Sequence, residues 1–291
     1  AYEIYSTMLL ISSYSLPLAV SKMVSTRVAV GQRRNAHKVL KGGLMIAGVT
    51  GAIGCIIVFF GARFITADIF KTPMSFYALR VLAPTLIIVA VLGVIRGFFQ
   101  GMGTMVPSAV SQVLEQIANA IVSVAAAYVL FGYGKRIGAV LGNEDMYAAA
   151  YGAAGGTLGT GVGAVVGLAF VLFVFSAFWP KMKRAERREA KRGNVKDESY
   201  RSIIKVMILT IVPVLLSTTL YNISSIIDQG IFKNIALMQG YSAHTISNWW
   251  GIFTGKYKVL INVPISIASA MGASCVPSLA AAYAAKDMDA V

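Results

Sequence analysis

"YGAAGGTLGTGVGAVVGLAFVLFVFSAFW", residues 151–179, is an apolar run without a single charged side chain. A helix needs about 20 mostly apolar residues to cross the hydrocarbon core of a bilayer, so this run is long enough to span a membrane. Four of its glycines recur at every fourth position: Gly155, Gly159, Gly163 and Gly167. This spacing predicts a helix with a bare ridge on one face, along which a second helix packs closely.

The composition of the whole chain agrees with a membrane environment. Hydrophobic residues make up 57% of the 291 residues and charged residues 13%, whereas a soluble domain carries about 25% charged residues. In lipid each backbone N–H and C=O group needs a partner within its own segment, so apolar spans form helices. We therefore predict an all-α fold, a polytopic transmembrane helix bundle with about seven spans, at residues 4–24, 42–64, 79–98, 108–131, 151–179, 203–226 and 248–272.

Small residues also form a stripe on the predicted span 42–64, which contains Gly43, Ala47, Gly51 and Cys55 at steps of four. This stripe predicts a second close helix–helix contact. The two cysteines, Cys55 and Cys275, lie far apart and show no metal-ligand spacing, so no metal site is predicted.

The net charge of +14 is concentrated in alternate connections between the predicted spans. One side receives 18 Lys and Arg residues, mainly from Lys22–Lys41 and Lys181–Lys205, and the other side receives 6. Because Lys and Arg accumulate in cytoplasmic loops, the two basic stretches are predicted to be cytoplasmic and to meet lipid headgroups. The alternative is that these basic stretches form a dedicated binding site for a partner. Nucleic acid is not expected as a partner because acids interrupt the second stretch: Glu186, Glu189, Asp197 and Glu198.

Polar side chains form stripes on several predicted spans. Gln112, Glu115, Gln116 and Asn119 share one face of the span 108–131. Asn222 and Asp228 belong to a stripe on the sixth span, and Lys258 and Asn262 to one on the seventh. A polar stripe on a spanning helix faces protein or water, so several stripes together predict a hydrated central cavity. For a single Ser or Asn, an interhelical hydrogen bond is the alternative.

Three stretches resemble a known superfamily: "LPLAVSKMVSTRVAVGQRRNAHKVL", residues 16–40, "APTLIIVAVLGVIRGFFQGMGTMVPSAVSQVLEQIAN", residues 83–119, and "VPISIASAMGASCVPSLAAAYAAKD", residues 263–287. They are similar to helices and turns of the multidrug/oligosaccharidyl-lipid/polysaccharide (MOP) exporter superfamily. The stretch 83–119 is the more specific match. It resembles the polysaccharide biosynthesis branch that includes the stage V sporulation B proteins and the MurJ-type lipid II flippases.

The resemblance implies a fold of two six-helix lobes, of which this chain is expected to be a fragment. Residues 1–180 are expected to form helices two to six of the N-terminal lobe. Residues 181–202 are expected to be a basic cytoplasmic linker, and residues 203–291 to begin the C-terminal lobe. The first helix and most of the second lobe are expected to be missing.

The resemblance also implies a function. It implies a multi-pass flippase of the bacterial plasma membrane, which moves a lipid-linked oligosaccharide or cell-wall precursor by alternating access. Such a protein is a transporter and not an enzyme. It needs no cofactor, and protons, sodium or the membrane potential would drive transport. The alternative within the superfamily is a multidrug or cation antiporter. A membrane-embedded transferase is a minor alternative, because the chain has only two histidines and no paired carboxylates in a loop.

Several residues are hypothesised to carry this function. Substrate binding is assigned to Lys258, Lys256, Asn262, Asn222 and Gln112, and ion coupling to Glu115 and Asp228. The resemblance places a cationic cavity position near Lys256 and Lys258, and helical geometry favours Lys258 because it shares a face with Asn262. Anchoring at the membrane interface is the alternative for both lysines, and a structural hydrogen bond is the alternative for Glu115.

Overall fold

The computed structural model describes residues 5, 9, 15–69, 72–191, 198–265 and 267–268. All regular elements within these ranges are helices, which confirms the predicted all-α class. The chain divides into two compact units, residues 1–226 and 227–291. They are described separately below.

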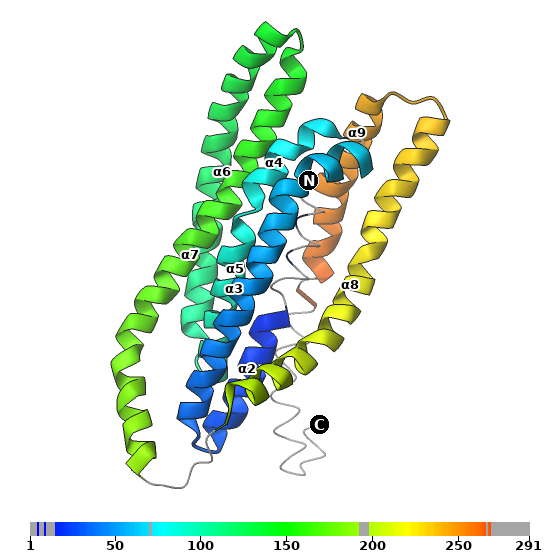
Figure 1. Cartoon of the computed structure of the whole chain (residues 1–291). Coiled ribbons are helices and arrows are strands. Elements are labelled where there is room, and N and C mark those ends of the chain that lie inside the picture. The colour runs from blue at the N-terminus through cyan, green and yellow to red at the C-terminus, as the bar shows by residue number, and fades with distance from the viewer. Residues whose placement is uncertain are drawn as a thin grey trace. The chain divides into compact units, whose positions relative to one another are not determined.

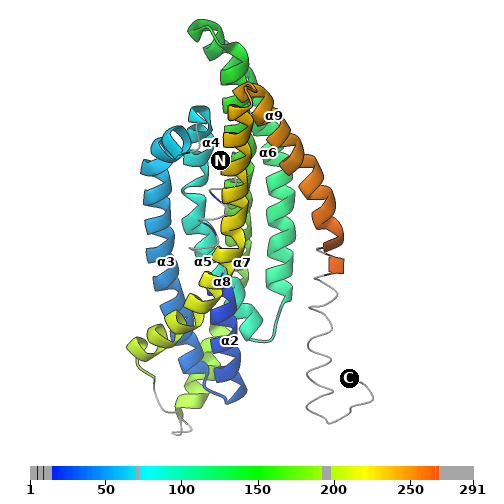
Figure 2. The same ribbon diagram turned by 90° about the vertical axis from the view of Figure 1, so that its right-hand side faces the viewer.

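Among the described residues, the first unit contains α2 to α7 and the first part of α8 (Figures 1 and 2). Its elements are α2 (Ser15–Ala29), α3 (Arg33–Phe64) with a π-helical end (Ile65–Ile69), a short 3₁₀ turn (Pro73–Ser75), α4 (Phe76–Leu82), α5 (Thr85–Gly101), α6 (Val106–Leu141), α7 (Glu144–Lys191) and the start of α8 (Tyr200–Met238). The second unit contains the end of α8, α9 (Ala243–Ile252), a π-helical turn (Phe253–Tyr257) and the helical residues that follow it.

Four helical segments of the described chain are long and apolar enough to cross a membrane: Arg33–Asp68, Pro73–Gly101, Val106–Leu141 and Glu144–Glu189. Each contains one predicted span, which confirms the spans at 42–64, 79–98, 108–131 and 151–179. The predicted spans 4–24 and 248–272 lie partly outside the described residues. The span 203–226 lies within α8, where several side chains are outside the description.

The glycine ridge of α7 packs directly on α6, and these two antiparallel helices make the most extensive contact in the molecule (Figure 1, green). A Cβ atom added to Gly155 would collide with the carbonyl group of Ala126, and one added to Gly163 would lie 2.6 Å from the carbonyl oxygen of Glu115. No side chain larger than hydrogen fits these positions without movement of the neighbouring backbone. The ridge predicted from the four-residue spacing is therefore confirmed, and α6 is its partner.

The hairpin of α6 and α7 continues well beyond the predicted spans, and both views show its tip projecting from the rest of the unit (Figures 1 and 2). The chain reverses at Gly142, whose φ of 78° is the left-handed conformation that glycine adopts without strain. Gly138 lies against the backbone of Glu144, so the close packing extends to the tip. The apolar residues predict the part of each helix that meets lipid. Helices α6 and α7 continue past that part because their close packing continues to Gly138.

The second small-residue stripe is also confirmed. Gly51 of α3 faces the backbone of Ile87 in α5, and Gly43 faces Val20 and Val94. Two glycines of α5, outside the predicted stripes, also allow a neighbouring helix to approach closely. Gly97 approaches Pro17 of α2, and Gly101 approaches Ser21. Helices α2, α3 and α5 thus form a tightly packed group beside the α6–α7 hairpin.

Candidate functional site

The predicted ion-coupling residue Glu115 lies in a polar cluster between α5, α6 and α7. Its Oε2 accepts a hydrogen bond from Arg96 Nη2 at 2.7 Å, and Arg96 Nε donates to Ser111 Oγ at 2.8 Å. Ser108 Oγ donates to the backbone carbonyl of Arg96 at 3.2 Å. The side chains of Arg96 and Glu115 are only 13% and 19% exposed, so this ion pair is largely shielded from solvent.

The position of Arg96 explains how the cluster forms. A turn at residues 102–105 joins α5 to α6, and it returns the chain so that Ser108 and Ser111 face the last turns of α5. Gly167 of α7 lies against the guanidinium group of Arg96, since an added Cβ would be 3.2 Å from Nη2. The glycine ridge therefore makes room for the arginine. Sequence reasoning missed this pair, although a lone Arg and a lone Glu in two spans joined by a short turn are a recognisable signal.

The rest of the predicted stripe on α6 is divided between two environments. Asn119 is half-buried, and its Oδ1 accepts a hydrogen bond from Ser123 Oγ at 2.9 Å. Ser123 also contacts the carbonyl oxygen of Gly156 on α7 at 2.7 Å. The predicted substrate residue Gln112 is exposed, as is Gln116. One edge of the stripe thus joins helices together, and the other edge is exposed.

The second unit contains four of the hypothesised site residues. Asp228 on α8, Lys256 in the π-helical turn and Asn262 beyond it are all exposed. Lys258 is half-buried, and its Nζ lies 5.7 Å from the ring centroid of Phe253, a cation–π geometry. The remaining residue, Asn222, lies on α8 in the first unit, and its side chain is outside the description.

The π-helical turn Phe253–Tyr257 immediately precedes Lys258. A π-helical turn holds an extra residue, so it changes the rotation between the residues before and after it. The predicted shared face of Lys258 and Asn262 is unaffected, because both follow the turn. Lys256 lies within the turn, so its rotation relative to Lys258 differs from that in a regular helix.

Aromatic rings gather next to Lys258 in the second unit. Phe232, Trp249, Trp250 and Phe253 line an apolar hollow of about 330 Å³. The rings of Phe232 and Trp250 are 5.4 Å apart, and those of Trp250 and Phe253 are 5.5 Å apart. Chemically, this arrangement can attract an anionic group and contact an apolar one.

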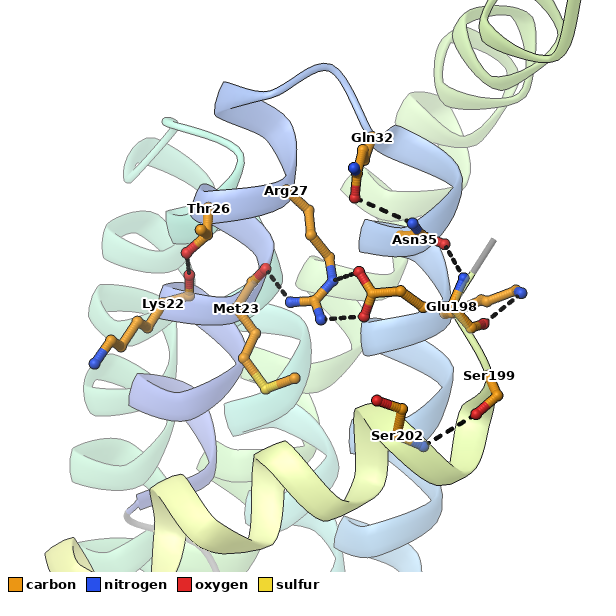
Figure 3. A network of polar contacts seen from close by, with 10 residues as sticks. Lys22, Met23, Thr26, Arg27, Gln32, Asn35, Glu198, Ser199 and Ser202 are labelled. Carbon is orange, nitrogen blue, oxygen red and sulfur yellow. Dashed lines mark hydrogen bonds and ion pairs between the residues drawn. The ribbon is translucent and has the colours of Figure 1, made fainter. Parts of the chain in front are cut away.

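A second polar cluster joins the α2–α3 turn to the segment that leads into α8 (Figure 3). Arg27 Nε and Nη2 donate to the two carboxylate oxygens of Glu198. The backbone of Glu198 is held as well: its N–H donates to Asn35 Oδ1 at 3.2 Å, and its carbonyl accepts from Lys38 Nζ at 2.8 Å. Every polar group of Glu198 is therefore engaged by α2 or α3, two residues before α8 begins.

Two further glutamates, at the end of α7, contact the first two turns of α3. Glu189 Oε2 accepts hydrogen bonds from the backbone N–H groups of Arg33 and Arg34, at 2.7 and 3.4 Å. These are the first N–H groups of α3, whose N-cap residue Gln32 makes no side-chain cap, so Glu189 supplies the missing cap. His37 Nδ1 lies 2.9 Å from Glu186 Oε1.

We expect the substitution Glu198→Gln to loosen the start of α8. It keeps the backbone hydrogen bonds and the size of the side chain but removes the charge that binds Arg27. A charge-assisted hydrogen bond contributes about 2 kcal/mol, so amide hydrogen exchange in residues 199–207 should accelerate by more than tenfold. Glu144→Gln, at an exposed position of α7, is the control and should leave this exchange unchanged. Equal exchange in both variants would contradict an anchoring role for Glu198.

Comparison with known proteins agrees with this architecture. The family model described as polysaccharide biosynthesis protein matches residues 1–282. The chain is 27% identical to the lipid II flippase MurJ of Bacillus subtilis strain 168, over 97% of this chain and 51% of that protein. It is 24% identical to the stage V sporulation protein B of the same organism, over 97% of this chain and 50% of that protein. The chain thus spans about half the length of these curated relatives. No solved structure matches it.

The family match covers nearly the whole chain and includes the four membrane-length helices and the Arg96–Glu115 cluster. It agrees with the resemblance of residues 83–119 to the polysaccharide biosynthesis branch of the MOP exporters. The chain belongs to the polysaccharide biosynthesis protein family, and it is a multi-pass protein of the plasma membrane.

Proposed function

We propose that the protein is a flippase, not an enzyme, and that it moves a lipid-linked oligosaccharide or cell-wall precursor outward by alternating access. Lipid II or a similar undecaprenyl-linked glycan is the proposed substrate. The observation that carries the proposal is the similarity to a lipid II flippase over 97% of the chain. The four membrane-length helices support it, because a flippase must enclose a path across the bilayer.

The charges of the described residues favour an anionic substrate over a cationic one. An exporter of cations needs available carboxylates in its cavity. Glu115 is paired with Arg96, so Asp228 is the one exposed carboxylate among the proposed site residues, against two lysines. Lys258 supplies positive charge beside the aromatic hollow, and Lys256 is an exposed cation two residues before it. We propose that the lysines, Asn222, Asn262 and Gln112 contact the headgroup.

Ion coupling is proposed for Glu115 and Asp228, without a cofactor. Binding of a proton or sodium ion at Glu115 would compete with Arg96 for the same carboxylate oxygens. Coupling at this position therefore requires the Arg96–Glu115 hydrogen bond to open during the transport cycle. Asp228 is exposed and would exchange ions directly with solvent.

The proposed function is tested by reconstitution into vesicles. The protein should move a fluorescent lipid II analogue between leaflets faster than empty vesicles do, and it should not drive efflux of the cationic dye ethidium. Ethidium efflux without lipid movement would contradict the proposal and support the antiporter alternative.

We expect Lys258→Gln to weaken binding of undecaprenyl pyrophosphate about tenfold, because a charge-assisted contact with a phosphate contributes about 1.5 kcal/mol. Lys258→Arg should bind nearly as well as the native protein, since the charge is retained. Native mass spectrometry of the purified variants measures both affinities. Lys256→Gln is the neighbouring control and should have a smaller effect. Equal binding by the Gln and Arg variants would leave Lys258 as an interfacial anchor.

A further inference from the structure

The last turns of α7 separate opposite charges onto two faces. Met182, Glu186 and Glu189, at steps of four and three residues, form the inner face. Met182 is buried, and both glutamates contact the start of α3. Lys181, Arg184 and Arg188, at steps of three and four, share the opposite face, and Arg187 adjoins it. All four of these basic side chains are exposed.

This separation changes the electrostatic character of the segment. In the sequence, acids alternate with bases between residues 181 and 189, and the two kinds of charge partly offset each other. In the fold, Glu186 and Glu189 are turned toward His37 and toward the N-terminus of α3. Glu198, the next described acid, is bound by Arg27. Between residues 181 and 189, the charged side chains on the outward face of α7 are therefore all basic.

The same face lies next to the expected edge of the hydrocarbon core. Phe173 is 71% exposed, and it precedes Arg184 by eleven residues, about three helical turns, so the two side chains share one face of the helix. Between these two residues the same face carries the exposed Ala177 and Pro180, and it becomes basic at Lys181. Trp179 points inward instead, onto the core and against His37, with ring centroids 4.8 Å apart. An exposed apolar face that becomes basic at the end of the apolar run matches the change from acyl chains to headgroups.

From these observations we propose that Lys181, Arg184, Arg187 and Arg188 form a docking surface for anionic phospholipid headgroups. The phosphate groups of such lipids lie at the depth where the four basic side chains begin. The three glutamates contribute indirectly, because their internal contacts remove negative charge from this face. The proposal does not depend on the transported substrate.

The test compares two double variants of the same composition. Lys181→Gln with Arg184→Gln removes one Lys and one Arg from the docking surface. Lys135→Gln with Arg136→Gln removes one Lys and one Arg, both exposed, from the tip of the α6–α7 hairpin. Native mass spectrometry measures how much phosphatidylglycerol and phosphatidylcholine each purified protein retains.

We expect the first variant to bind phosphatidylglycerol about 25-fold more weakly than the native chain, since each basic residue near an anionic surface contributes about fivefold. The hairpin-tip variant should bind it as the native chain does. The preference for phosphatidylglycerol over phosphatidylcholine should decrease as salt increases, because exposed charges are screened. Equal retention by the two variants would overturn the proposal. Preferential retention of undecaprenyl pyrophosphate at this face would also overturn it, by assigning the surface to the transported lipid.

Discussion

Replacing Gly159 by alanine is expected to lower the thermal unfolding temperature of the protein by about 5 °C. The added Cβ would meet Ser123 Oγ and would lie 2.6 Å from the carbonyl oxygen of Asn119, so α6 and α7 would have to move apart. Overpacking of a tight contact costs about 1–3 kcal/mol. For a chain of this size, 1 kcal/mol corresponds to about 2–4 °C.

Gly156 provides a matched control on the same helix. It lies three residues before Gly159, and a Cβ added there would meet no atom within 4 Å. Gly156→Ala should therefore leave the unfolding temperature unchanged or raise it, because alanine favours a helix by about 1 kcal/mol over glycine. Unfolding of purified protein in detergent, followed by tryptophan fluorescence, measures both variants. The same unfolding temperature for both would mean that the ridge does not mediate the α6–α7 contact.

The second large effect is expected at the Arg96–Glu115 pair. Removal of one partner leaves the other charge largely buried without compensation, which costs about 3 kcal/mol or more. We therefore expect Glu115→Gln and Arg96→Gln each to lower the free energy of unfolding by about this amount. The double variant should lose much less than the sum of the single losses, because it leaves no unpaired charge.

A double-mutant cycle measures this coupling directly. The control is Gln116→Ala, an exposed neighbour on α6, which should change stability little. Additive losses in the cycle would contradict the ion pair. In a transport assay, the same Glu115→Gln variant shows whether Glu115 only binds Arg96 or also couples transport to an ion. If its transport keeps the full dependence on pH and sodium, the role of Glu115 is limited to binding Arg96.

Much of the architecture could be predicted from local properties of the chain. The apolar length of 151–179 and the spacing of its glycines predicted a spanning helix with a close-packed face, and α6 occupies that face in the structure. The stripe at Gly43 and Gly51 was predicted in the same way. Helix formation in lipid depends on the residues of one segment, and a small-residue ridge is repeated along one helix. Both features can therefore be predicted from one segment, without knowing which helix packs against it.

Charge pairs between distant segments could not be predicted, because they depend on which helices meet. Arg96 and Glu115 lie in neighbouring predicted spans, but only the fold shows that they bind each other between α5 and α6. Glu198 and Arg27 are 171 residues apart, and a count of charges in loops says nothing about such contacts. The resemblance named the superfamily, but the role of each acid at the end of α7 followed from the fold. Electrostatic energy falls with distance, so the function of a charged residue is decided by the neighbours that tertiary packing brings to it.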